Sequence, residues 1–202
     1  MADEWDLPEA EDMAGSGGSY LDQPGTYHLL INEVRDGCGP KGNPIDGFSI
    51  ECEVMAGTVE GCAGKKVGIT IWKPNLAGSE KQIAMGKRIG AAFFIATDII
   101  NPNQLGKPGA IDCNLANGRQ FIIKLARQQK DGKDTDFLQP HYSDIWHVDD
   151  PDVDTIPKDV DSLAIIAKQW RHDASYFAYK ARKKAQVKQE TPAPAANDFS
   201  DL

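Results

Sequence analysis

The chain has 202 residues, and its 22 Lys and Arg against 30 Asp and Glu give a formal net charge of −8. This length suits one domain with appendages or two small domains, and it can bury a core without disulfides or a metal. The four cysteines form no CxxC pair, and no apolar stretch reaches the roughly 18 residues of a membrane-spanning helix. The acidic N-terminus lacks the basic start and apolar centre of a signal peptide, so we expect a cytoplasmic protein with reduced thiols and no membrane partner.

The negative charge is concentrated at the two ends of the chain. Residues 1–22 carry seven acidic residues and no basic one, and the last thirteen residues carry three acids, so the residues between have a net charge of +2. We predict a disordered acidic arm over residues 1–24, which includes the Gly/Ser run 15–19, and a disordered acidic tail over 189–202. The acidic isoelectric point therefore does not describe the body of the protein.

Three strands are predicted after the arm, at residues 25–35, 46–55 and 65–72. The second alternates between apolar and polar residues, with one side formed by Phe48, Ile50, Cys52 and Val54, and the third repeats this pattern. Period-two alternation indicates half-buried antiparallel strands. The joining segments, 36–45 and 56–64, are rich in turn residues.

A helix is predicted next, because the period changes after Ser79. Gln82 stands three residues after Ser79, which is the spacing of a capping box, and one helical face follows at Met85, Ile89, Ala92, Phe93 and Ala96. Two further strands are predicted at 119–127 and 137–148, joined by a polar hairpin loop at 128–136. Pro140 indicates that the last strand is an edge strand or contains a bulge.

The order strand, strand, strand, helix, strand, strand is that of an oligonucleotide/oligosaccharide-binding (OB) fold. We therefore predict a mainly β protein whose domain, residues 25–148, is a five-stranded OB-fold barrel with a helix between strands three and four. A generic α+β sandwich is the alternative.

Two segments follow the predicted barrel. Residues 149–160 carry many aspartates and are predicted to be an acidic linker. Residues 161–188 are predicted to form an amphipathic basic helix with an apolar stripe that includes Leu163, Ile166, Trp170 and Phe177. Such a stripe is expected to pack on the barrel or on a second subunit, so a homo-oligomer is one arrangement that it predicts.

The sequence offers no catalytic constellation that outweighs a structural interpretation. His141 and His147 could share a strand face, but a solvated or barrel-surface pair is favoured over a metal site. Glu51 and Glu53 fit an outward, solvated strand face better than a Mg²⁺-dependent nuclease. There is no phosphate-binding loop and no hydrolase motif. We expect no enzyme activity, no cofactor and no metal.

Binding is better supported, because cations and an aromatic ring fall where an OB fold holds its ligand: on strands two and three and on the loops joining strands one–two and four–five. Aromatic rings stack on bases, and Lys and Arg contact phosphates. The predicted nucleic-acid-binding residues are Arg35, Lys41, Lys66, Trp72, Lys73, Lys124, Arg127, Lys130 and Lys133.

The segments KKVGITIW (65–72), NGRQFIIK (117–124) and DFSDL (198–202), together with the strand plan, resemble bacteriophage-encoded single-stranded-DNA-binding proteins. The resemblance covers about residues 23–148 and the tail. It implies an acidic tail that recruits replication or recombination proteins, with Asp198, Phe199, Asp201 and Leu202 in the matching places.

The function predicted from the sequence is therefore non-sequence-specific coating of single-stranded DNA during phage replication or recombination. The alternatives are a protein-interaction module of a phage replisome or virion, and a Mg²⁺-dependent nuclease.

Overall fold

A computed structural model describes residues 19–39, 41–106, 111–130 and 132–166. The chain divides into two units, Met1–Arg171 and His172–Leu202, and every described residue belongs to the first. The predicted acidic arm lies almost wholly outside the described residues, and so do the tail and most of the predicted basic helix.

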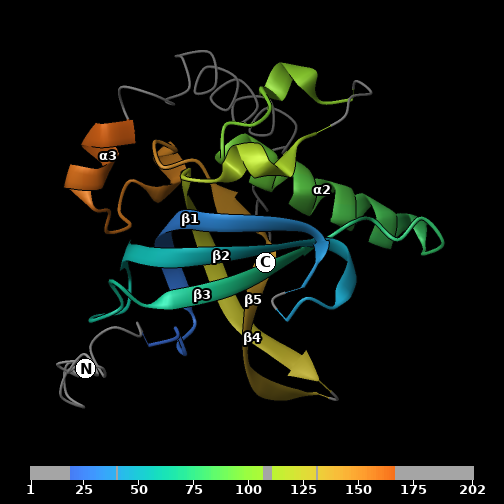
Figure 1. Ribbon diagram of the computed structural model, residues 1–202, viewed down its shortest axis with the longest axis horizontal. Coiled ribbons are helices and arrows are strands. Elements are labelled where there is room, and N and C mark those ends of the chain that lie inside the picture. The colour runs from blue at the N-terminus through green and yellow to red at the C-terminus, as the bar shows by residue number, and fades with distance from the viewer. Residues whose placement is uncertain (1–18, 40, 107–110, 131, 167–202) are drawn as a thin grey trace, which may run out of the picture. The chain divides into compact units, whose positions relative to one another are not determined.

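One antiparallel sheet dominates the structure (Figure 1). Its strands are β1 (Gly25–Cys38), β2 (Pro44–Gly57), β3 (Lys66–Trp72), β4 (Gln120–Lys130) and β5 (Lys133–Trp146), in the order β3-β2-β1-β4-β5. The predicted mainly β class is confirmed. In the described part of the chain no ladder joins β3 to β5, so the sheet is not a closed barrel, although these two edge strands approach each other.

The predicted alternation of β2 and β3 is confirmed by burial. Phe48, Ile50, Cys52 and Val54 are buried, as are Val67, Ile69 and Ile71. Ser49 stands on the polar side of this alternation but is also buried, and its hydroxyl donates a hydrogen bond to the Cys38 carbonyl at 2.7 Å. The register of β2 against β3, Phe48 opposite Ile71 and Glu51 opposite Gly68, places the apolar side chains of both strands in one core.

The predicted helix is α2 (Glu80–Ala96), between β3 and β4. Ser79 is its N-cap, and the reciprocal bonds of a capping box with Gln82 are present, as predicted. Phe93 is fully buried and makes an edge-to-face contact with Phe121 at 5.5 Å between ring centroids. α2 therefore covers the core side of the sheet and contacts β5 and β3.

Two predicted loops are shorter than expected. Residues 128–136 were predicted to be a polar loop, but β4 runs to Lys130 and β5 begins at Lys133. These strand ends have no buried face, so their sequence shows no alternation of apolar and polar residues. Gly132 supplies the positive φ of 73° that the tight turn between them requires. In the same way β1 extends to Cys38 and β2 begins at Pro44.

The prediction for Pro140 is confirmed, because β5 is an edge strand and its register with β4 shifts beside Pro140, between the pairs of Ile123 and Leu125. Proline lacks the N–H that a continuous ladder needs, so an edge or a bulge is where a strand accepts it.

The segment predicted to be an acidic linker, residues 149–160, is packed on the sheet. Asp150 and Val153 are buried, and Val153 forms a second apolar cluster with Ile122 of β4 and Val148. A short helix, α3 (Val160–Ile166), follows, and Leu163 of the predicted apolar stripe packs against this cluster. The many aspartates of residues 149–160 predicted a solvated linker, but the apolar residues between them bury their side chains and hold the segment on the sheet.

None of the helices in the described part of the chain is long and apolar enough to cross a membrane.

Candidate nucleic-acid interface

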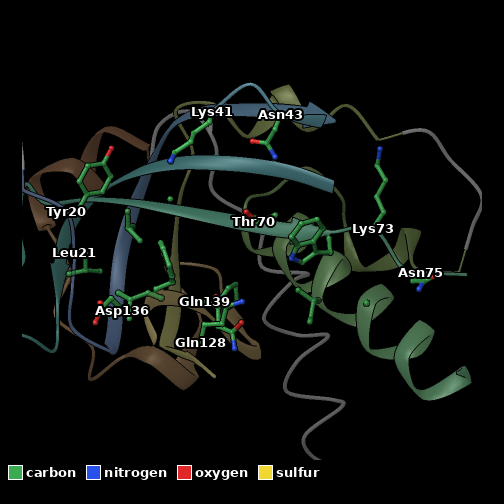
Figure 2. Close-up of a pocket in the computed structure, with 18 of the residues that line it drawn as sticks. Tyr20, Leu21, Lys41, Asn43, Thr70, Lys73, Asn75, Gln128, Asp136 and Gln139 are labelled. Carbon is green, nitrogen blue, oxygen red and sulfur yellow. The ribbon is translucent and has the colours of Figure 1, made fainter. Parts of the chain in front are cut away.

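A cavity of about 1010 Å³ opens where β3 and β5 fail to pair. One wall is β3, from Val67 to Trp72, and the opposite wall is the segment of β5 from Asp136 to Pro140. Lys41 and Asn43, from the β1–β2 connection, and Gln128, near the end of β4, also line it (Figure 2). We call this cavity the β3–β5 groove. Residues from the two predicted ligand-binding loops, 36–45 and 128–136, therefore lie around one cavity.

Exposed aromatic rings line the groove. Trp72 is 59% exposed, because it alternates on β3 with the buried residues Ile69 and Ile71. Phe137 is 72% exposed and Tyr20 is 75% exposed, and both also line the groove. Sequence reasoning missed Phe137 and Tyr20, because one was placed at the start of a half-buried strand and the other in the acidic arm. Large exposed aromatic side chains around one cavity are unusual unless they bind something.

Gly68 leaves the β3 wall of the groove open. It lies in mid-strand, where glycine is unfavourable, and a Cβ atom added to it would meet nothing within 4 Å. Glycine inside a strand commonly marks a place where a ligand or another backbone approaches closely. Its position in the groove favours the ligand interpretation.

The edge of β3 that faces the groove also carries peptide groups that make no hydrogen bond within the described chain. The backbone N–H of Lys66 donates to the Ser19 carbonyl, and its carbonyl accepts from the Leu21 N–H, so both groups point away from β2. Every second residue of a strand directs its peptide groups to the same edge. The peptide groups of Gly68, Thr70 and Trp72 therefore also point away from β2. None of these three residues makes an outward hydrogen bond in the described chain. The groove therefore offers backbone donors and acceptors as well as side chains.

Two of the predicted cations, Lys41 and Lys73, line the groove. Lys73 lies 3.1 Å from Asp36 at the end of β1. The hydrogen bond to Asp36 raises the pKa of Lys73. Lys41 forms no ion pair with the described residues, so its charge is available to a phosphate.

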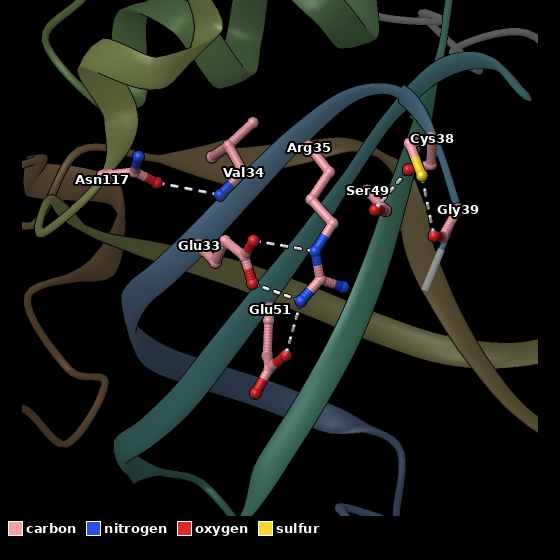
Figure 3. Close-up of polar contacts among 8 residues, drawn as sticks. All are labelled: Glu33, Val34, Arg35, Cys38, Gly39, Ser49, Glu51 and Asn117. Atoms are coloured by element: carbon pink, nitrogen blue, oxygen red, sulfur yellow. Dashed lines mark hydrogen bonds and ion pairs between the residues drawn. The ribbon is translucent and has the colours of Figure 1, made fainter. Parts of the chain in front are cut away.

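Arg35 and Arg127, which were also predicted to bind nucleic acid, do not line the groove. Figure 3 shows Arg35 on the sheet surface between Glu33 and Glu51, with its Nε 2.9 Å from the Glu33 carboxylate. The hydrogen bond to Glu33 raises the pKa of Arg35. Arg127 donates to the backbone carbonyls of Asp22, at 3.0 Å, and Thr135. Both guanidinium groups are therefore engaged within the protein.

The other four predicted cations lie outside the groove lining. Lys130 and Lys133 face each other at the β4–β5 turn, and Lys66 begins β3. None of the three forms an ion pair with the described residues. Lys124 lies two residues after Ile122 on β4, so the two side chains share one face of the sheet. Ile122 packs against Val148 and Val153, so this face is the one away from the main core.

The histidines and acidic side chains considered in the sequence can be placed in the described residues. No group of three or more His, Cys, Asp or Glu side chains there is arranged to hold a metal ion. Nδ1 of His141 lies 2.6 Å from the Asp144 carboxylate. The prediction that His147 is solvated is wrong, because it is 3% exposed and accepts a hydrogen bond from the Asp149 N–H. The predicted partner-binding residues, Asp198, Phe199, Asp201 and Leu202, lie outside the described residues.

No known family model matches this chain, and no curated protein is detectably similar to it in sequence.

Proposed function

We propose that this protein binds single-stranded DNA in the β3–β5 groove, as a phage-type single-stranded-DNA-binding protein of OB architecture. The strand order and the position of α2 between β3 and β4 support that architecture, since an OB fold is a five-stranded, partly open barrel. Its ligand face lies on strands two and three between the β1–β2 and β4–β5 connections. Residues from both connections line the groove.

The observation that carries the proposal is the pairing of exposed aromatic rings with an open strand wall. Trp72 of β3 and Phe137 of β5 lie on the two strands that border the groove, and both rings are exposed. Gly68 of β3 has no side chain, so the space in front of this strand is open. Base–aromatic stacking contributes about 1–3 kcal/mol per base and accepts any base. Lys41 in the groove, with Lys66, Lys130 and Lys133 outside it, supplies charge for phosphates. This is the chemistry of a protein that binds single strands.

Filling the groove at Gly68 tests the proposal. Gly68→Val adds a β-branched residue in mid-strand at a position with no steric conflict, so the melting temperature should stay the same or rise. The added side chain would occupy the space of the bound strand. Affinity for a fluorescent oligo-dT, measured by anisotropy, should fall by at least about tenfold, which is about 1.4 kcal/mol. Gly68→Ala should cause a smaller loss.

Gly47 of β2 does not line the groove, and its substitution shows what replacing a tightly packed strand glycine does to stability. Its Cβ would come within 2.5 Å of the Ile71 carbonyl, so Gly47→Ala should destabilise the protein. If the folded Gly68→Val variant bound oligo-dT as tightly as the natural protein, the β3–β5 groove would not be the DNA site.

A protein-interaction module is the second candidate, and the unpaired edge of β3 favours it. An extended peptide can add to such an edge through main-chain hydrogen bonds, and residues 19–21 already do so at Lys66. Anisotropy separates the two candidates, because an interaction module would leave oligo-dT unbound at every salt concentration.

A further inference from the structure

The lining of the β3–β5 groove is close to electrically neutral. Its charged side chains are Lys41, Lys73, Asp22 and Asp136. Lys73 pairs with Asp36, and Asp22 pairs with Lys65 at 3.3 Å. A groove built only to follow a phosphate backbone would carry an excess of positive charge. The interior of this groove is instead suited to the uncharged part of a nucleotide.

Amide side chains are the main polar groups of the lining. Asn43, Gln128 and Gln139 are exposed, line the groove and form no side-chain hydrogen bond with the described residues. Gln128 and Gln139 come from the neighbouring strands β4 and β5 and are drawn at the lower wall in Figure 2. Each amide presents a donor next to an acceptor, in the geometry that pairs with a base edge.

Phe137 lies two residues before Gln139, so the two side chains share one side of β5. A base stacked on the Phe137 ring would therefore have an amide near its edge. Gly68, Thr70 and Trp72 line the opposite wall, and their peptide groups, which make no outward hydrogen bond in the described chain, offer further donors and acceptors.

We infer that the groove recognises bases by hydrogen bonds to their edges, through Gln128 and Gln139, and that the protein discriminates between single-stranded DNA sequences. This inference rests on the proposed function and departs from the sequence-based expectation of non-specific coating. Proteins that rely on stacking and charge alone show only modest sequence preferences. Phosphates would then contact Lys41 and the lysines outside the groove, Lys66, Lys130 and Lys133.

The test compares oligo-dA, oligo-dC and oligo-dT of equal length by anisotropy at about 200 mM salt, where the phosphate contribution is reduced. The span, meaning the ratio of the highest to the lowest of the three affinities, should be about fivefold or more for the natural protein. One bidentate contact to a base edge accounts for a difference of this size. Gln128→Met and Gln139→Met keep the side-chain length and remove the hydrogen bonds. In the double variant the span should fall below about twofold.

Gln129→Met is the matched control. Gln129 is adjacent on β4, but it does not line the groove, and its amide donates to the Asp134 carboxylate at 3.1 Å. This variant should keep the full span. Equal affinities of the natural protein for the three oligonucleotides, or a span unchanged in the double variant, would overturn the inference and leave the proposed function standing. Failure to bind any oligonucleotide would overturn both.

Discussion

The backbone N–H of Asp159 donates a hydrogen bond to Nδ1 of His28 at 3.1 Å, across 131 residues of sequence. Nε2 of the same ring lies 2.8 Å from the side-chain oxygen of Gln120, so the neutral ring carries its proton on Nε2. His28 is fully buried on β1. One histidine thus joins β1, β4 and the segment that leads into α3.

This arrangement predicts that stability falls at mildly acidic pH. Burial lowers the pKa of His28 below its ordinary value of 6.5, with the positive charge of Lys158 acting in the same direction and Gln120 and Asp159 opposing it. The unfolded chain therefore binds the proton more readily than the folded one. The contribution of neutral His28 to the free energy of unfolding is complete above pH 6.5 and is lost as the pH falls from 6.5 towards the lower folded pKa.

Urea denaturation between pH 5 and pH 8 checks this prediction. His28→Asn keeps an oxygen acceptor for the Asp159 N–H and cannot titrate, so its free energy of unfolding should change less steeply with pH. Parallel pH profiles of the two proteins would show that His28 does not control the acid sensitivity.

The N-cap of α2 should contribute measurably to stability. Ser79→Ala removes the hydroxyl that accepts the Gln82 N–H, so the free energy of unfolding should fall by about 0.5–2 kcal/mol. Ser79→Gly should cost less than Ser79→Ala, because glycine lets water reach the same N–H groups. Chemical denaturation of the three proteins gives the order, and an alanine variant as stable as the natural protein would argue against the cap.

Lys41 and Arg35 should differ in how they affect the salt dependence of DNA binding. Lys41 lines the groove without an ion partner among the described residues, so Lys41→Gln should reduce the slope of log affinity against log salt by about 0.7. Arg35 is neutralised by Glu33 and Glu51, so Arg35→Gln should leave the slope unchanged. Anisotropy titrations at several salt concentrations measure both slopes, and the opposite result would place phosphates on the β1–β2 surface.

Ile122→Ala should loosen the segment that was expected to be a linker. Ile122 is fully buried against Val148 and Val153, so truncation should cost about 2–5 kcal/mol. Limited proteolysis should then cleave within residues 149–160 faster than in the natural protein. Unchanged cleavage would mean that this cluster does not hold the segment on the sheet.

Deletion of residues 190–202 tests the predicted recruitment by the tail, whose sequence carries a net charge of −3 around Phe199 and Leu202. Single-strand affinity should stay the same or rise slightly at low salt, because an acidic segment no longer competes with DNA. Capture of replication proteins by the full chain should be lost. Weaker DNA binding after the deletion would place the tail in the DNA site.

The local elements of this fold are determined by the sequence. The alternation from Phe48 to Val54 specifies a half-buried strand wherever it lies, because successive side chains point to opposite faces. Ser79 and Gln82 specify the start of α2, because the capping box is completed within one helical turn. Local signals of this kind need no knowledge of distant residues.

The site depends on contacts between distant residues, which only the tertiary structure decides. Arg35 and Lys41 look alike as loop-side cations, but the pairing of β1 with β2 brings Glu51 next to Arg35 and leaves Lys41 free of an ion pair in the described chain. The β3–β5 groove likewise arises because two strands that are about sixty residues apart in sequence approach without pairing. Phe137 and Gln139 become candidates for binding only once their opposite wall is known, because a side chain's environment is fixed by its neighbours in space.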